Sequence, residues 1–193
     1  MLEVLFAYFE RTWTLTPEEK DLITSLVIPR VLKKGEFLLR EGDPVKYGAF
    51  IAKGFLRSFV IDNKGKEHIV QFAPENWWIG DKAGVSKDAK ASFFIDAIED
   101  SEIFLVDYNG HMTLMEKSPG YATSFQAGMQ KRGVAKDKRI VQSLSATAEE
   151  RYNDFIATYP SIVQRVPQHM LASFLGVTPE TVSRIRKQQS NKK

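Results

Sequence analysis

The sequence predicts an α+β fold in which an antiparallel β-roll is followed by a long helix and a helix-turn-helix. Three observations predict it. Short β-rich runs alternate with turn signals from residue 28 to residue 106. A helical run follows over residues 119–144. Two short helical segments joined at Gly176 then occupy residues 168–187.

Composition limits the classes of protein to be considered. The chain has 193 residues, of which 43% are hydrophobic, so it can form one large domain or two small ones. It has no cysteine, which excludes disulfides, thiolate metal sites and cysteine-ligated iron–sulfur clusters. The apolar start carries Glu3 and Glu10 and no basic residue, unlike a signal peptide. No apolar run approaches the ~20 residues of a membrane span. We therefore expect a soluble cytoplasmic protein without a membrane partner.

Charge is unevenly distributed along the chain. The net charge is +3, from 27 basic and 24 acidic residues. Residues 160–193 hold six Lys or Arg and one Glu, a balance of +5, which leaves 21 basic and 23 acidic residues, a balance of −2, for the remainder. A basic C-terminal segment on a nearly neutral body favours binding to phosphates.

The first elements are two amphipathic helices, predicted at residues 2–11 and 17–26. Thr16 is a favourable N-cap for the second helix, and Pro17 suits its first position. From residue 28 the pattern changes to short strands separated by turn residues, which is typical of an antiparallel sandwich or jelly roll. The predicted strands are residues 28–32, 36–40, 47–52, 55–61, 67–72, 77–79, 92–98 and 102–106. The turn Asp62-Asn63-Lys64-Gly65 predicts a hairpin between two of them.

After the strands, a short helix is predicted at residues 108–117 and a long helix at residues 119–144, which would span about 39 Å. The long helix has a narrow seam with a 4-3-4-3 spacing, formed by Tyr121, Phe125, Gly128, Arg132 and Ala135. Val134, Val141 and Leu144 extend an apolar side of the helix. Such a seam favours pairing with a second copy of the chain, and the alternative is packing on its own domain alone.

A further helix is predicted at residues 146–158, where Thr147 and Glu150 have the spacing of a capping box. The helix would pack against the helix-turn-helix through Tyr152, Phe155, Ile156 and Tyr159. Residues 163–166 read as a short strand.

The helix-turn-helix is predicted from side-chain spacing. Leu171, Ala172 and Leu175 form one apolar face, and Gly176 can adopt positive φ at the end of that helix. Thr178 and Pro179 are suitable first residues for a second helix. Val182 and Ile185 would face back, leaving a polar surface for a DNA major groove. The alternative is an ordinary helical hairpin, although its exposed face would not need to be so poor in acids.

With its elements in this order, nearly the whole chain resembles the Crp/Fnr superfamily of bacterial transcription regulators. In the N-terminal half the resemblance rests on Lys34-Gly35-Glu36, Arg40-Glu41-Gly42-Asp43, Phe50-Ile51-Ala52-Lys53-Gly54, Gly65-Lys66-Glu67 and Trp78-Ile79-Gly80-Asp81. It implies a cyclic-nucleotide-binding-like sensor domain at residues 1–117, a dimerisation helix at 118–145 and a winged-helix-like, helix-turn-helix DNA-binding domain at 146–193. It also implies a homodimer that reads palindromic double-stranded DNA, with RNA polymerase as a further candidate partner.

The resemblance places the effector pocket at Gly80, Asp81, Lys90, Ala91 and Ser92. Relatives that bind cyclic AMP have Gly-Glu and Arg-Ser pairs where this chain has Gly80-Asp81 and Ala91-Ser92. Without that Arg, a bidentate phosphate contact cannot form, and Lys90 offers only a point charge. We therefore expect no cyclic AMP binding of the usual kind. The predicted cofactor is none, apart from an unidentified small-molecule effector, because His68, His111 and His169 are isolated and no metal site is indicated.

In the second helix of the helix-turn-helix, the family reads bases with Arg-Glu-Thr-Val-x-Arg. This chain has Pro179 in place of the first Arg and keeps Glu180 and Arg184. By resemblance, Arg184 would contact guanine and Glu180 would contact cytosine. Ser183 lies on the same side. Residues better placed for phosphates are Gln168, His169, Thr178, Thr181 and Lys187.

Two other classes of function were weighed. A cupin-like enzyme needs a cluster of metal-binding histidines, and His68 alone lies in the predicted roll. We therefore predict that the chain is not an enzyme. A ligand-sensing module that acts through protein contacts remains the alternative, and the basic helix-turn-helix argues against it.

Overall fold

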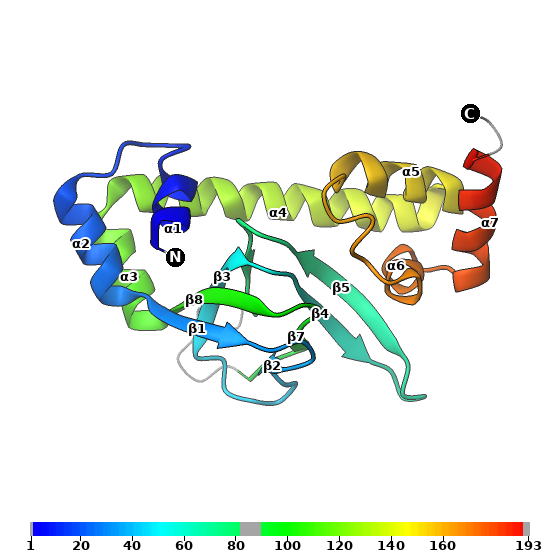
Figure 1. Cartoon of the computed structure of the whole chain (residues 1–193), viewed down its shortest axis with the longest axis horizontal. Coiled ribbons are helices and arrows are strands. Elements are labelled where there is room, and N and C mark those ends of the chain that lie inside the picture. The colour runs from blue at the N-terminus through cyan, green and yellow to red at the C-terminus, as the bar shows by residue number, and fades with distance from the viewer. Residues whose placement is uncertain (1, 82–89, 191–193) are drawn as a thin grey trace. The chain divides into compact units, whose positions relative to one another are not determined.

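The structure is a computed structural model that describes residues 2–81 and 90–190 (Figure 1). The chain divides into two compact units. The first contains residues 1–60 and 70–128, and the second contains residues 61–69 and 129–193. The α+β fold class is confirmed, since antiparallel sheets, a long helix and a helix-turn-helix are all present.

Fifteen elements follow one another through the described residues. The helices are α1 (Leu2–Phe9), α2 (Pro17–Leu26), α3 (Tyr108–Lys117), α4 (Pro119–Ser145), α5 (Ala148–Thr158), α6 (Gln168–Leu175) and α7 (Pro179–Ser190). The strands are β1 (Ile28–Leu32), β2 (Phe37–Leu39), β3 (Tyr47–Lys53), β4 (Leu56–Ile61), β5 (Glu67–Ala73), β6 (Trp78–Ile79), β7 (Phe94–Ala97) and β8 (Ser101–Asp107).

The strands form two four-stranded sheets, with orders β1-β8-β3-β6 and β2-β7-β4-β5. Neighbours in the first sheet pair antiparallel, with Ile28 opposite Leu105 and Tyr47 opposite Asp107. In the second sheet Leu56 lies opposite Ala97. Strands far apart in sequence are therefore neighbours, as expected for the predicted roll rather than for a simple meander.

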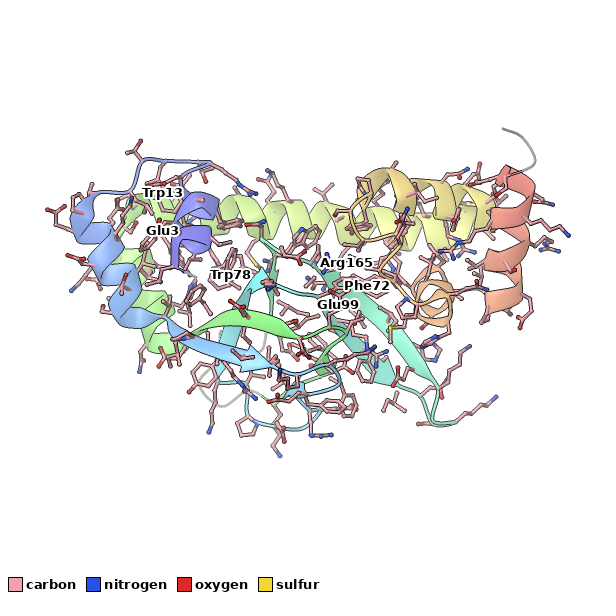
Figure 2. All side chains as sticks on the ribbon, viewed as in Figure 1. Glu3, Trp13, Phe72, Trp78, Glu99 and Arg165 are labelled. Carbon is pink, nitrogen blue, oxygen red and sulfur yellow. The ribbon has the colours of Figure 1, made fainter. Side chains whose placement is uncertain are left out.

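The central strands of the first sheet, β3 and β8, are buried on both faces, and side-chain alternation shows how. Ala49 and Ile51 point into the roll, as do Leu105 and Ile103, their partners on β8. There they join Leu56 and Ile95 in one core cluster. Phe50 and the alternate residues on β8 point the other way and pack with residues of α1, α2 and α3 in a second cluster. Figure 2 labels Trp13 and Trp78 within this second cluster. Their rings lie 5.1 and 6.5 Å from that of Phe9.

Side-chain caps fix where α2 and α5 begin. The Thr16 hydroxyl accepts a hydrogen bond from the Glu19 amide, and the Glu19 carboxylate accepts one from the Thr16 amide. Thr147 and Glu150 make the same reciprocal pair at the start of α5. Each pair satisfies backbone donors that a helix start leaves without partners. The predicted capping box at Thr147 is thus confirmed.

The roll also holds a buried ion pair that the sequence analysis missed. Arg57 on β4 donates through Nε to Asp96 Oδ1 at 2.7 Å and through a terminal nitrogen to Oδ2 at 3.0 Å. The two residues are 6% and 7% exposed. The guanidinium also lies 4.2 Å from the ring centroid of Phe59. This bidentate geometry offsets part of the cost of removing both charges from water.

The strand predicted at residues 163–166 is wrong. Residues 160–165 form consecutive turns, and the Val166 amide donates to the Ile162 carbonyl at 3.0 Å. Ile162 and Val166 are buried at 0% and 5% exposure, and their four-residue spacing is helical rather than alternating. The described residues between α5 and α6 therefore contain no strand that could form a wing. Within the described ranges, no helix has both the length and the hydropathy needed to cross a membrane.

Candidate nucleic-acid interface and effector site

The helix-turn-helix is held together by a small apolar core. Leu171, Ala172 and Leu175 on α6 and Val182 and Ile185 on α7 are all at most 5% exposed. These are the residues whose spacing predicted the motif. Because these residues bury one side of each helix, the opposite side of α7 is exposed to solvent.

The turn between the helices is fixed by backbone hydrogen bonds. Gly176 adopts φ 67° and ψ 37°, in the left-handed region. Its amide donates to the Ser173 carbonyl, and the Val177 amide donates to the Ala172 carbonyl, both near 3 Å. This pattern satisfies carbonyls that a helix end leaves unpaired. The Thr178 hydroxyl then accepts from the Thr181 amide at 3.3 Å and caps α7.

The exposed side of α7 carries the predicted base-contacting residues. Glu180, Ser183, Arg184 and Lys187 are all exposed. Positions 180, 184 and 187 recur at helical spacing and so share one face. Within the described residues, Arg184 makes no ion pair. The arrangement leaves a cation and a hydroxyl accessible on one side of a rigid helix.

The carboxylate of Glu180 lies at the start of α7. Hydrogen bonds from its own backbone amide and from the Thr178 hydroxyl lower the pKa of Glu180. The group is therefore ionised at neutral pH and acts only as an acceptor. Its position also suits the positive end of the helix dipole.

The residues predicted to contact phosphates divide into two groups. His169, Thr178 and Lys187 are exposed. Gln168 and Thr181 are partly buried and serve the motif itself: the Gln168 amide donates to the Pro179 carbonyl at 2.8 Å. The Thr181 hydroxyl lies 3.2 Å from that of Thr178. Gln168 and Thr181 therefore position the start of α7 in the free protein.

Arg186 has a structural role that the sequence analysis did not identify. Its Nε donates to the Tyr152 hydroxyl at 3.0 Å, and the guanidinium lies 5.9 Å from the centre of that ring. Arg186 therefore attaches α7 to α5, whereas Arg184, two residues earlier, is exposed. The 200° angle between positions two apart on a helix, which follows from about 3.6 residues per turn, could have indicated this difference.

The hairpin tip at residues 61–69 contacts α4 and α6 within the second unit. The Ser173 hydroxyl accepts from the Ile69 amide at 3.0 Å and donates to the Glu67 carbonyl at 2.9 Å. Arg139 on α4 donates to the carbonyls of Ile69 and Phe174 at 2.8 and 2.9 Å. These backbone contacts explain why the tip groups with the helix-turn-helix. They involve no sequence motif, and neither Ser173 nor Arg139 was predicted to have a role.

The predicted effector residues flank positions 82–89, which are outside the described residues. The Ser92 amide donates to Asp81 Oδ2 at 2.6 Å. Ala91 is buried, and its backbone pairs with Gly42 and Asp43. Gly80 packs on β3, where an added Cβ would lie 3.4 Å from the Gly48 Cα. The Asp81 carboxylate thus already accepts the hydrogen bond of the Ser92 amide. Its negative charge also disfavours a bound anion at this position by like-charge repulsion.

Lys90 is exposed and forms an isolated bridge with Pro44. It therefore stands at the surface of the loop, while the neighbouring Ala91 fills the interior. The fork geometry that would hold a phosphate in two hydrogen bonds is absent from positions 90–92 of the sequence. That any phosphate contact here would be a point charge stays a prediction.

The long helix α4 has different surroundings along its length. Tyr121 is 4% exposed, and its hydroxyl lies 2.9 Å from His111 Nδ1. Phe125 lies over the His111 ring, with centroids 4.4 Å apart. These two seam residues therefore pack in the first unit of their own chain. Gly128 and Arg132 are partly exposed and Ala135 is exposed. The most exposed apolar residues of α4 follow later: Val134, Ile140, Val141 and Leu144 are 58–84% exposed.

A metal centre is not indicated by the described residues, among which no three His, Asp or Glu side chains gather as ligands would. His68 instead bonds to Asp62, with Nε2 2.8 Å from Oδ2. That contact and the amides of Lys66 and Lys64 lower the pKa of Asp62 to about 2. The pair stabilises the hairpin turn and leaves His68 without the neighbours that metal coordination requires.

Comparison with known proteins shows which proteins the chain is similar to. The pattern of the cyclic nucleotide-binding domain matches residues 29–118. The transcriptional activator protein anr of Pseudomonas aeruginosa is 26% identical over 185 residues, covering 89% of this chain and 75% of that protein. FixK2 from Bradyrhizobium japonicum has a similar structure, with a TM-score of 0.74 and 20% identity over 86% of each chain. Catabolite activator protein from Thermus thermophilus matches with a TM-score of 0.57 and 22% identity, over 92% of this chain and 85% of that one.

Residues 29–118 thus match a cyclic nucleotide-binding domain, and most of the chain is similar to transcriptional regulators of the Crp/Fnr family. The predicted resemblance and the predicted fold class are confirmed. These similar proteins are transcriptional regulators and not enzymes. The matched domain of this chain includes strands β2–β8 and most of β1.

Proposed function

We propose that this chain is a Crp/Fnr-type regulator that binds palindromic double-stranded DNA as a homodimer and inserts α7 into the major groove. One observation carries the proposal. Val182 and Ile185 are buried against α6, while Ser183, Arg184 and Lys187 project from the opposite, exposed side of α7. A recognition helix needs this division, because one face must be held rigidly while the other meets base edges.

Within this interface, Arg184 and Glu180 are the residues that would read sequence. Arg184 can donate two hydrogen bonds to guanine O6 and N7, and the ionised Glu180 can accept from cytosine N4. Pro179 cannot contact a base through a charged side chain, so the preferred DNA site differs from that of relatives with Arg at this position. His169, Thr178 and Lys187 would contact phosphates and set the register.

The sensor would respond to something other than cyclic AMP bound in the usual way. Two features support this: Ala91 replaces the phosphate-binding Arg, and Asp81 occupies the Ser92 amide. The effector is then a small molecule of other chemistry. RNA polymerase is the further partner that a regulator of this kind would contact.

The proposal is tested by selecting bound duplexes from a random pool with the purified protein. A palindromic consensus is expected, with half-sites one helical turn apart. Arg184→Ala should cost about 1–3 kcal/mol and relax one base position in each half-site. Lys187→Ala is the matched control. It should weaken binding to all DNA sequences alike, and it should reduce by about one the slope of the logarithm of the binding constant against the logarithm of the salt concentration.

Two results would contradict the proposal. If no sequence is enriched, either with or without added cell extract, sequence-specific recognition of DNA is excluded. Equal weakening of all duplexes by Arg184→Ala would show that this side chain contacts phosphates rather than bases.

A further inference from the structure

A cavity of about 310 Å³ lies within the second unit, between the hairpin tip and the helices α4, α5 and α6. The rings of Phe155, Tyr159 and Phe174 line it together with polar side chains that include Lys138 and Arg151. Its volume is at the lower end of the range for small-molecule sites, and its walls combine apolar surface with a few polar groups, as such sites do.

The charges around this cavity do not balance. Among the described residues that line it, Asp154 is the single carboxylate, and it forms an ion pair with Lys138. Arg139 is held by two backbone carbonyls and lies 4.0 Å from the ring centroid of Phe174. Burial lowers the pKa of Arg139, which marks a site that disfavours cations. An anionic ligand would relieve that penalty.

Arg151 forms no ion pair within the part of the chain that the structure describes. It lies on α5, and a terminal nitrogen of its guanidinium is 3.8 Å from the position of a Cβ added to Gly176. Its Nε is buried and finds no hydrogen-bond partner among the described residues. A buried donor without an acceptor is costly, so a bound acceptor beside Arg151 Nε would be stabilising.

We propose that this cavity binds a small organic anion, with a carboxylate or phosphate on a flat apolar body. The anionic group would pair with Arg151, whose planar fork fits either oxyanion. The body would lie against Phe155, Tyr159 and Phe174. The start of β5 contributes His68 and Ile69 to this site, but the site contains none of the predicted effector residues and none of the residues on the exposed side of α7. The proposal concerns ligand binding whether or not the chain recognises DNA.

Isothermal titration of the full chain tests the proposal with three probes: benzoate, phenyl phosphate and inorganic phosphate. At least one of the two ring-bearing probes should bind at least about tenfold more tightly than inorganic phosphate, and the tighter of them identifies the anionic group. Arg151→Gln should weaken that binding by about tenfold or more, because it removes a charge-assisted hydrogen bond. Arg30→Gln is the matched control, since Arg30 is also partly buried but pairs with Glu36 on the roll. It should leave binding unchanged.

A second variant keeps the test decisive if Arg151→Gln fails to fold. Thr158 lines the cavity from the exposed last turn of α5, where a larger side chain can be accommodated. Thr158→Trp should fill part of the cavity and abolish binding of the ring-bearing probes. The proposal is overturned if neither ring-bearing probe binds at 10 mM (about 2.7 kcal/mol), if inorganic phosphate binds equally well, or if both cavity variants bind like the wild type.

Discussion

At the scale of single residues, the surroundings of a charge decide what that charge contributes. Arg57 and Asp96 form their bidentate pair inside the roll, with side chains 7% and 10% exposed. Arg30 and Glu36 form a pair of similar length, 2.9 Å, with side chains 39% and 41% exposed. Water competes with the second pair and not with the first, so the two should respond differently to the same substitution.

Arg57→Gln should therefore destabilise the protein by about 3–5 kcal/mol, because it leaves the Asp96 carboxylate buried without its partner. Arg30→Gln, the same chemical change at an exposed pair, should cost at most about 1 kcal/mol. Urea unfolding followed by circular dichroism measures both. Similar losses for the two variants would show that the buried pair is not the source of the difference.

His111 links protonation to the packing of α3 on α4. Its ring is enclosed by Tyr121 and Phe125, and burial lowers the pKa of His111. The unfolded chain then binds the proton more tightly than the folded chain does. The stabilising contribution is therefore complete above the unfolded pKa of about 6.5 and is lost as pH falls towards the lower folded value.

The midpoint of thermal unfolding should thus decrease between pH 7.5 and pH 5.5. Replacing His111 with Gln should make that decrease smaller, because a titrating group has been removed. His169→Gln is the control, because it removes an exposed histidine that takes no part in the packing of α3 on α4. Differential scanning calorimetry at several pH values distinguishes the variants, and identical slopes for His111→Gln and wild type would refute the assignment.

At the scale of elements, two glycines show how backbone conformation sets the effect of a side chain. Gly176 adopts φ +67° at the end of α6. Gly133 lies inside α4, and a Cβ added there would meet no neighbouring atom within 4 Å. The same substitution by alanine therefore strains one position and relieves the other.

Gly176→Ala should destabilise the protein by about 1–2 kcal/mol, the cost of a left-handed conformation for a residue with a Cβ. Gly133→Ala should stabilise it by about 0.5–1 kcal/mol, because glycine is the poorer helix former. Chemical denaturation measured under one set of conditions gives both values. If the two changes had the same sign, the left-handed turn at Gly176 would be in question.

Local signals predicted most elements of this chain. Thr16 and Thr147 each stand three residues before a Glu, and both helices begin where that spacing indicates. The strand predicted at residues 163–166 was wrong. Its two valines suggested a strand, but the structure buries Ile162 and Val166 by means of successive turns. Tertiary packing there outweighs a weak β propensity.

At the scale of the whole molecule, the parts that could not be predicted are contacts between distant segments. The exposed face of α7 follows from local spacing. Ser173 bonds to backbone atoms of Glu67 and Ile69, more than a hundred positions earlier, and a single sequence gives no sign of that pairing. Arg139 likewise bonds to the carbonyls of Ile69 and Phe174, and its place in the sequence of α4 does not indicate either partner. The cavity beside them was therefore invisible to sequence reasoning.

The C-terminal half of α4 is an apolar surface that one chain leaves uncovered. Val134 and Val141 are seven residues apart and lie on one side of the helix, with Leu144 following three residues later. They are 64%, 60% and 84% exposed. Tyr121 and Phe125 belong to the packing of the first unit, so the proposed contact between two copies centres on this later stretch.

Val141→Asp should convert the proposed dimer to monomer, because two carboxylates would be buried opposite each other at a symmetric interface. The dissociation constant should rise by more than about tenfold, equivalent to about 1.4 kcal/mol. Val31→Asp is a matched control: Val31 on β1 is 58% exposed, close to the 60% of Val141, and lies outside α4. Sedimentation equilibrium measures both variants. Wild-type protein that sediments as a monomer would contradict dimerisation, and a dimer lost equally in both variants would place the contact elsewhere.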